Sequence, residues 1–297
     1  MCGIVGLFLK NPKLEPQLGA LLSGMLATMS DRGPDSAGFA VYGADGAGVK
    51  LTLRGRDPAA LSGAVSGLEA HLGAPVEATP RDTHTVIALP AEREAQARTW
   101  LAANAPGIDV VGAGRRMEIY KEVGLPATVA ERFDLAGMAG THGIGHTRMA
   151  TESAVTTNGA HPFSTGTDEC LVHNGSLSNH NDLRRRLQRE GLTFATQNDT
   201  EVAAGYLSWR MREGASLKEA LESSLSDLDG FFTFVVGTES GFAVVRDPIA
   251  CKPAVMAETD DYVAFGSEYR ALVGLPGIDG ARVFEPEPAQ VYAWERH

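Results

Sequence analysis

The chain has 297 residues, 43% of them hydrophobic, and a formal net charge of −11. This length and apolar content allow one large core, or one main domain with a sizeable insertion. The acidic charge argues against binding to nucleic acid or to acidic membrane surfaces. No apolar run approaches the ~20 residues that a membrane span requires.

Cysteine usage and the N-terminal segment indicate the compartment. Cys2, Cys170 and Cys251 are too few and too scattered for a disulfide framework or a cysteine-rich zinc site. The apolar run at the N-terminus is short and no basic residue precedes it, so a secretory signal is not expected. We therefore expect a cytoplasmic protein whose thiols stay reduced.

The first forty residues predict a strand, a helix and a second strand. Residues 1–9 are typical of a buried strand, and from Leu18 the apolar residues recur on one helix face. The helix should end near Ser30, because turn-forming residues follow it. The next strand is expected from Phe39 to Gly43.

Residues 50–138 differ in composition, being rich in Ala, Gly and Pro. No glycine-rich phosphate-binding loop occurs among them. We interpret the segment as a small α/β unit inserted into the main domain. Its expected strands are 85–89, 108–111 and 117–123, and its expected helices are 91–104 and 127–133.

The rest of the chain predicts helices followed by strands. The last helix should begin with a capping box formed by Ser216 and Glu219. Helices layered on antiparallel sheets fit this order, which is an α+β architecture. The expected helices are 180–190, 199–212 and 217–227, and the expected strands are 231–236, 241–245, 262–265 and 291–294.

Cys2 offers a specific chemistry. Removal of Met1 would leave a cysteine with a free α-amine, and an amine of pKa ~7.7–8 can accept the proton of a thiol whose pKa is near ~8.5. The alternative is a small buried hydrophobic residue at the start of a strand.

Seven segments stand out in chain order: 2–6, 31–38, 145–151, 173–175 with Asn181 and Leu183, 198–201, 246–253 and 266–268. Taken together, they resemble the class II glutamine amidotransferases, which are N-terminal-nucleophile hydrolases. The resemblance covers most of the chain outside 50–138 and implies a four-layer αββα sandwich for residues 1–297.

The resemblance assigns the catalytic roles to three residues. Cys2 would attack the side-chain amide of glutamine and form a thioester, with its α-amine passing the proton to the leaving ammonia. The Asn174 side chain and the Gly175 N–H would stabilise the oxyanion. Asn174-Gly175 also suits a type I′ hairpin turn, which is the structural alternative.

The resemblance also assigns substrate-binding residues. Arg148 would pair with the α-carboxylate of glutamine and Asp199 with its α-ammonium group. The alternatives are a surface ion pair for Arg148 and a helix N-cap for Asp199. Arg32 would close over the site from a mobile loop, or hold a turn. Thr151 and His161 complete the expected substrate-binding set.

Other residues have simpler interpretations. The spacing of His146, His161 and His173 does not match a zinc hydrolase, so no metal is expected. The histidines should be structural or should support the residues that contact the substrate. Cys170 and Cys251 are expected in the core. Many relatives have tryptophan where Met149 stands, which leaves the wall of the glutamine pocket open to question.

The resemblance implies a partner as well. Because the chain ends at His297 without an appended acceptor domain, we expect a separate synthase subunit that receives ammonia. The likeness is greatest to the amidotransferase subunit of glutamate-synthase-like enzymes such as N-methylglutamate synthase, whose other subunits carry a flavin barrel and a β-helix. No cofactor is expected in this chain; FMN and an iron–sulfur cluster would belong to a partner.

Three alternatives stay open at this point. The chain would be a scaffold subunit that has lost turnover, or an N-terminal-nucleophile acylase of other specificity. The true ligand would be glutamate rather than glutamine in the N-methylglutamate synthase interpretation.

Overall fold

The computed structural model describes residues 2–46, 48–150 and 154–296. Its α-helices are α1 (Leu18–Ala27), α2 (Pro58–Leu72), α3 (Glu94–Asn104), α4 (Pro126–Arg132), α5 (His180–Arg189), α6 (Asp199–Arg212) and α7 (Leu217–Asp227). Its strands are β1 (Gly3–Leu9), β2 (Ser36–Tyr42), β3 (Val49–Gly55), β4 (Glu77–Arg81), β5 (His84–Leu89), β6 (Ile108–Gly114), β7 (Met117–Val123), β8 (His142–Arg148), β9 (Phe163–Gly166), β10 (Glu169–Leu177), β11 (Gly230–Gly237), β12 (Gly241–Arg246), β13 (Val255–Glu258), β14 (Tyr262–Gly266), β15 (Arg282–Phe284) and β16 (Val291–Glu295).

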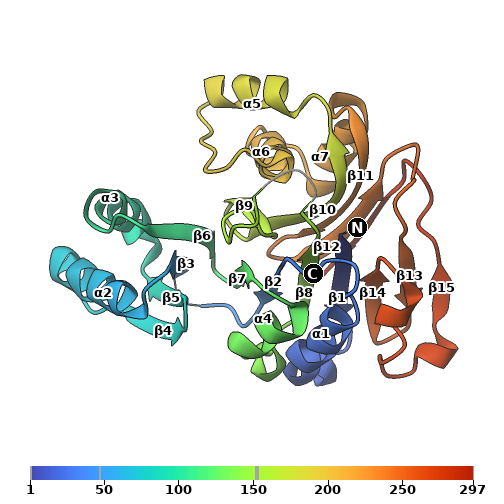
Figure 1. Cartoon of the computed structure of the whole chain (residues 1–297), viewed down its shortest axis with the longest axis horizontal. Coiled ribbons are helices and arrows are strands. Elements are labelled where there is room, and N and C mark those ends of the chain that lie inside the picture. Colours follow the sequence, from blue (N-terminus) through green and yellow to red (C-terminus); the bar gives the residue numbers. More distant parts are fainter. Residues whose placement is uncertain (1, 47, 151–153, 297) are drawn as a thin grey trace.

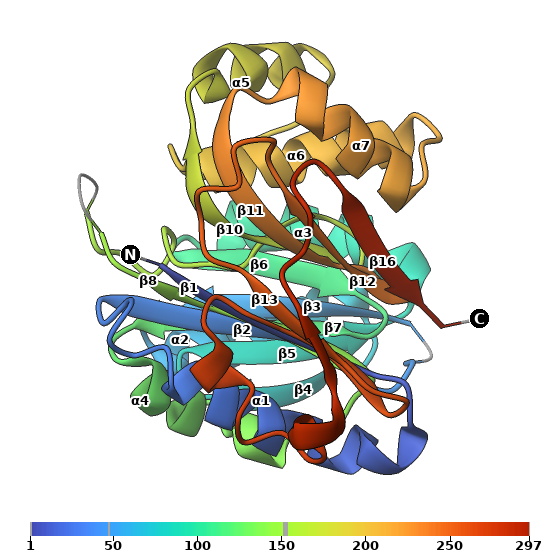
Figure 2. The same cartoon turned by 90° about the vertical axis from the view of Figure 1, so that its right-hand side faces the viewer.

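Two antiparallel sheets form the centre of the molecule. The seven-stranded sheet has the order β15-β13-β14-β1-β8-β2-β7, and the five-stranded sheet has the order β16-β12-β11-β10-β9. Helices α5, α6 and α7 cover one outer face, and α1 and α4 cover the other (Figures 1 and 2). The structure thus has the expected α+β, four-layer αββα architecture.

Strand β1 lies near the middle of this arrangement because both of its faces are apolar. Val5, Leu7 and Leu9 pack under α1 and α4, whereas Ile4 and Phe8 face the five-stranded sheet. All of these side chains are at most 3% exposed. A strand buried on both faces reads as a continuous apolar run, which is how residues 3–9 appear in the sequence.

Strand β8 is less apolar and is fitted to the helix above it by two glycines. A Cβ at Gly143 would lie 2.8 Å from Cδ2 of Leu22, and one at Gly145 would lie 3.0 Å from Cδ1 of Leu26. Helix α1 therefore packs directly on the backbone of β8, next to β1. This close packing holds β8 in place beside β1, the strand that begins next to Cys2.

A third sheet, of order β4-β5-β3-β6, forms the small α/β unit with α2 and α3. This unit spans 49–114, which is narrower than the predicted 50–138. Strand β7 pairs with β2 in the seven-stranded sheet, and α4 packs against α1, so the prediction that both belong to the small unit is wrong. Asp168 holds the connection between β6 of the small unit and β7 of the main sheet. Its carboxylate accepts hydrogen bonds of 2.7–2.9 Å from the backbone N–H groups of residues 115–117.

Among the described residues, no helix combines the length and the apolar character needed to cross a membrane.

Candidate active site

Cys2 lies at the N-terminal end of β1, between β14 and β8. Its backbone carbonyl accepts a 3.0 Å hydrogen bond from Nε of Arg32 and a 3.3 Å hydrogen bond from Nδ2 of Asn174. Two residues further on, Ile4 and Ser267 exchange two hydrogen bonds of 2.9 Å. The backbone at Cys2 is thus held from both sides, and Cys2 itself is half-buried.

Arg32 acts on the main chain of Cys2 in this structure. Its side chain is buried, and Nη1 donates to Glu268 Oε1 at 2.6 Å. That hydrogen bond, with Arg270 at 2.7 Å on the other oxygen, lowers the pKa of the Glu268 carboxyl. Arg32 is thus anchored between Cys2 and Glu268 and is not among the residues that line the cleft beside Cys2. Its closing role stays a prediction.

A cleft of about 690 Å³ opens beside Cys2. Most of the residues predicted to form the site line it together: Cys2, Arg148, His161, Asn174, Gly175 and Asp199. Thr151 lies outside the described residues. Met149 also lines the cleft and is 39% exposed.

Asn174 and Gly175 lie within β10 and not in a turn. They pair with Thr233 and Phe232 of β11, so the hairpin-turn interpretation is wrong. Gly175 has φ +155°, and a Cβ there would lie 1.9 Å from the carbonyl oxygen of Phe231. Only glycine fits this backbone, and Gly175 lines the cleft next to the buried Asn174.

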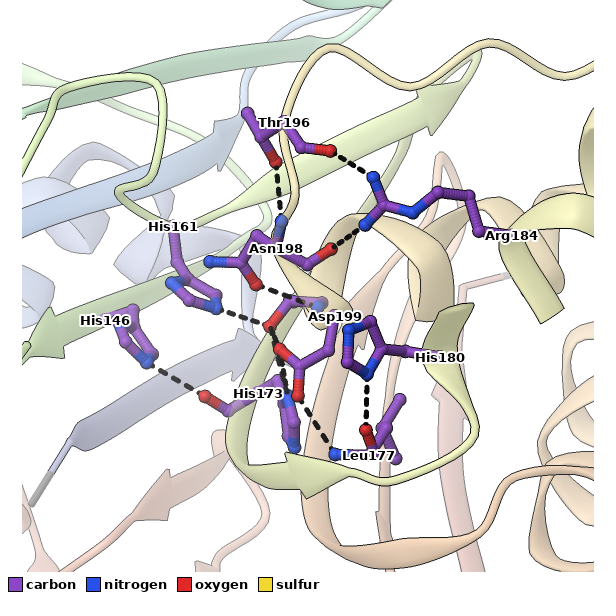
Figure 3. Close-up of polar contacts among 10 residues, drawn as sticks. His146, His161, His173, Leu177, His180, Arg184, Thr196, Asn198 and Asp199 are labelled. Atoms are coloured by element: carbon purple, nitrogen blue, oxygen red, sulfur yellow. Dashed lines mark hydrogen bonds and ion pairs between the residues drawn. The ribbon is translucent and has the colours of Figure 1, made fainter. Parts of the chain in front are cut away.

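Asp199 is the first residue of α6, and the helix cap is its neighbour. Asn198 Oδ1 accepts from Thr200 N at 2.9 Å, so the N-cap interpretation of Asp199 is wrong. Asp199 Oδ2 accepts from Leu177 N at 3.0 Å (Figure 3). This bond ties the start of α6 to the end of β10, and the other carboxylate oxygen lies 3.8 Å from Nδ1 of His173.

Three histidines form a buried cluster behind these residues. The Thr200 hydroxyl lies 2.7 Å from His161 Nε2 and 3.0 Å from His173 Nδ1, and the His146 ring stacks on that of His161 at 4.0 Å. Burial lowers the pKa of His146 to about 3 and also lowers those of His161 and His173. All three are therefore neutral at pH 7. Figure 3 shows the His146 ring against the backbone carbonyl of His173, with Nε2 3.0 Å from that oxygen.

This cluster does not form a metal site. Within the described ranges, no group of three or more His, Cys, Asp or Glu side chains is arranged to hold a metal ion.

Arg148 ends β8 and is 6% exposed, so the surface ion-pair interpretation is wrong. Its Nη1 donates to the carbonyl of Ala154 at 3.4 Å. Arg148 thus lines the cleft with its guanidinium beside Ala154.

Of the two cysteines that were predicted to lie in the core, Cys170 does and Cys251 does not. Cys170 is buried in β10, where burial raises the pKa of its thiol to about 12, and the Tyr42 hydroxyl lies 3.2 Å from its sulfur. Cys251 is exposed, so its predicted place in the core is wrong. It follows Ala250, whose φ of +50° belongs to a surface turn.

Several residues that line the cleft were given no role from the sequence. They are Lys252, His180 and the segment 196–198. Arg184 supports that segment by donating to the carbonyls of Thr196 at 2.5 Å and Asn198 at 3.3 Å (Figure 3). In the sequence, Lys252 was indicated only by its position within the segment 246–253, which resembles the family.

The fold and cleft define a class of protein. An αββα sandwich in which the residue at the N-terminal end of a central strand, here Cys2, opens into a cleft is the architecture of N-terminal-nucleophile hydrolases.

Comparisons with known proteins narrow this class. A model described as a glutamine amidotransferase domain matches residues 146–274. The chain is 64% identical to the glutamine amidotransferase-like protein GlxB of Rhizobium meliloti, over 99% of this chain and 98% of that protein. It is 36% identical to a putative glutamine amidotransferase of Methanothermobacter thermautotrophicus, over 99% and 100% of the two chains. The protein belongs to the class II glutamine amidotransferase family.

A solved structure supports the fold. The glutamine phosphoribosylpyrophosphate amidotransferase from B. subtilis matches with a TM-score of 0.63 at 21% identity, over 99% of this chain and 47% of that one. The present chain thus spans about half the length of that protein. At this identity the likeness concerns the fold alone.

Proposed function

We propose that this protein cleaves the γ-amide of glutamine at Cys2 and passes the ammonia to a separate synthase subunit. The observation that carries the proposal is the convergence on one cleft of a half-buried cysteine, the Asn174 and Gly175 donors, and the charged groups of Arg148 and Asp199. Each of these groups has a role in amide cleavage of an α-amino acid.

The proposed reaction has two stages. After removal of Met1, the α-amine of Cys2 accepts the thiol proton, and the sulfur attacks the amide carbon. The C–N bond breaks, the amine gives the proton to the leaving nitrogen, and a thioester remains. Water then hydrolyses the thioester to glutamate. The neutral histidines behind the cleft do not compete as bases at pH 7, since burial lowers the pKa of His161 and His173.

Donors and charges hold the substrate during these steps. The Asn174 amide and the Gly175 N–H would bind the oxyanion, and loss of one such donor typically reduces the rate ~10²–10³-fold. Arg148 would take the α-carboxylate as a planar fork, and Asp199 the α-ammonium group. Thr151 and His161 stay as proposed substrate-binding residues, and Arg32 supports Cys2 from behind through its carbonyl.

Labelling with a glutamine analogue that carries an electrophilic carbon in place of the amide tests the nucleophile. We expect one adduct per chain, on Cys2, and protection by excess glutamine. The exposed Cys251 serves as an internal control, because its thiol lies outside the cleft lining. Modification of Cys251 with Cys2 untouched would rule out the proposal.

The acceptor is proposed to be a partner subunit with a flavin barrel, alongside a β-helix subunit, as in N-methylglutamate synthase. Ammonia released into water is protonated and lost as a nucleophile, which favours direct transfer. Purification from the native source should recover these subunits together with FMN and an iron–sulfur cluster, and no nucleic acid or membrane. Recovery of this chain alone at cellular salt concentration would contradict the partner assignment and leave the glutaminase assignment intact.

A scaffold without turnover is the second candidate. The exposed Met149 at the cleft wall favours it, because the resemblance leads us to expect tryptophan at this position. Glutamine hydrolysis by the purified chain would eliminate this candidate, and hydrolysis of N-acyl compounds instead of glutamine would favour an acylase.

A further inference from the structure

The segment 154–162, which lies between β8 and β9, forms one wall of the cleft. It supports Arg148, because Nη1 of Arg148 donates to the carbonyl of Ala154 at 3.4 Å. It also carries His161, whose Nε2 lies 2.7 Å from the Thr200 hydroxyl. The positions of two proposed substrate-binding residues therefore depend on the shape of this segment. Its members that line the cleft are Ala154, Thr156, Gly159 and His161.

One buried lysine holds the backbone of this segment. Lys121 lies on β7, at the edge of the seven-stranded sheet, and is 4% exposed. Figure 1 shows β7 between β2 and the small α/β unit. Nζ of Lys121 donates to the carbonyls of Ala160 at 2.9 Å, Pro162 at 3.2 Å and Asn158 at 3.4 Å. An ammonium group has three donors, so each of them has a carbonyl of the segment as its partner.

Two carboxylates hold the same segment by its side chains. Glu122, the next residue on β7, accepts a hydrogen bond from the Thr157 hydroxyl. Asp109 on β6 accepts one from Nδ2 of Asn158 at 3.2 Å. These contacts engage side chains, so the three carbonyls depend on Lys121.

The hydrogen bonds of Lys121 require its charged form. A neutral amine keeps two N–H donors and gains a lone pair. One buried carbonyl would then lose its partner and face that lone pair, which is unfavourable. Deprotonation of Lys121 should therefore loosen the segment.

The surroundings of Lys121 place this change close to neutral pH. Burial lowers the pKa of Lys121 to about 8; Glu201 on α6 opposes this effect, Arg54 on β3 adds to it, and Asp109 on β6 opposes it. The rings of His84 and His161 are neutral, because burial lowers their pKa values. The ammonium form therefore prevails at pH 7 and is lost as the pH rises above 8.

We infer that Lys121 is a positioning residue for the substrate: its ammonium group sets the shape of the segment 154–162, and the cleft binds glutamine tightly only while this group is charged. The inference rests on the proposed function of the cleft. Lys121 is not among the described residues that line the cleft, so its effect on binding passes through the segment to Arg148 and His161. Misplacement of a positioning group by about 1 Å costs up to ~10²-fold in rate.

Calorimetric titration of Cys2→Ala with L-glutamine at pH 7 tests the inference without turnover. Adding Lys121→Met, which keeps a side chain of similar length but removes its donors, should raise the Kd about tenfold. Adding Lys218→Met instead, which removes an exposed lysine on α7, is the matched control and should leave the Kd unchanged.

Kinetics of the protein with Cys2 intact separate positioning from a general structural defect. Lys121→Met should raise KM about tenfold and change kcat less than threefold, because Lys121 touches no reacting group. A general loss of structure would lower kcat instead, and that result would contradict the positioning role.

The pH dependence separates the charge of Lys121 from the rest of its side chain. The ratio of Kd between Lys121→Met and its Cys2→Ala parent should fall from about tenfold at pH 7 toward one at pH 9.5, because the parent then lacks the cation as well. Nuclear magnetic resonance of Cys2→Ala labelled with ¹³C at the lysine Cε follows the group directly. We expect one lysine that titrates near pH 8. Its midpoint should rise in saturating glutamine, since the coupling between proton and ligand is reciprocal.

Two results would overturn the role of Lys121 alone. One is a Kd that Lys121→Met changes less than threefold at pH 7, and the other is a titration midpoint that glutamine leaves unchanged. The second result is measured without the substitution, so it decides the question even if Lys121→Met does not fold. Glutamine that fails to bind Cys2→Ala at any pH would overturn the proposed function together with this inference.

Discussion

Cys2→Ala is expected to abolish glutamine hydrolysis while leaving the fold intact. The carbonyl of Cys2 takes the hydrogen bonds from Arg32 and Asn174, and alanine retains that carbonyl. Only the sulfur is lost, so the thioester route is closed. We expect kcat to fall by about 10⁴-fold or more, the scale seen when hydrolases lose their nucleophile. Ammonia release is the measurement.

Two further variants test whether the activity requires the Cys2 sulfur in particular and its free α-amine. Cys251→Ala removes an exposed thiol and should leave ammonia release unchanged. A variant with Met1 retained keeps the sulfur but lacks the free α-amine, and it should also be inactive. Cys2→Ala with activity within tenfold of the parent protein, at the same thermal stability, would show that the amide is cleaved elsewhere.

The elements predicted best are those with strong periodicity. The helix expected from Leu18 is α1, and the capping box at Ser216 and Glu219 is formed as expected. The strand at the N-terminus extends to Leu9, as its apolar run predicts. In these segments the local pattern and the tertiary environment favour the same structure.

The elements that were missed owe their structure to packing. Strand β8 is broken in the sequence by Gly143 and Gly145, which resemble loop residues until α1 is placed upon them. Helix α2 is rich in small residues, and a Cβ at Gly67 would lie 2.6 Å from the ring of Trp100 on α3. Small residues at such contacts weaken the periodic signal while making the contact possible.

The site shows the same division. The order of the motifs along the chain predicted Cys2, Asn174 and Asp199 as site residues. The structure brings all three to one cleft. The place of Lys252 in the cleft wall and the supporting contacts of Arg184 were not predicted, because both depend on segments that approach one another only in three dimensions. The position of Cys251 likewise depends on a turn whose backbone, at Ala250, has positive φ.

Acid is expected to unfold the protein cooperatively near pH 5. Burial lowers the pKa values of His84, His142 and His146 to about 3, against about 6.5 in an unfolded chain. Those of His161 and His173 are lowered as well. Below pH 6.5 these histidines therefore bind protons in the unfolded chain but stay neutral in the folded chain. The free energy of unfolding accordingly falls as the pH falls.

The expected loss is large compared with the stability of a typical domain. At pH 5 each such histidine reduces the free energy of unfolding by about 2 kcal/mol relative to pH 8. Three of them account for about 6 kcal/mol, out of the roughly 5–15 kcal/mol of an ordinary protein. The lowered pKa of Glu268, which depends on Arg32, acts in the same direction at still lower pH.

Urea unfolding at pH 8, 6.5 and 5, followed by near-UV circular dichroism, measures this loss. His84 packs edge-on against Phe133 at 4.7 Å, so His84→Phe removes one titrating ring from an aromatic environment. The drop in unfolding free energy between pH 8 and pH 5 should be smaller in that variant by about 2 kcal/mol. His71→Gln replaces an exposed histidine and should retain the full drop. An unfolding free energy that stays constant from pH 8 to pH 5 would mean that these buried rings accept protons in the folded state.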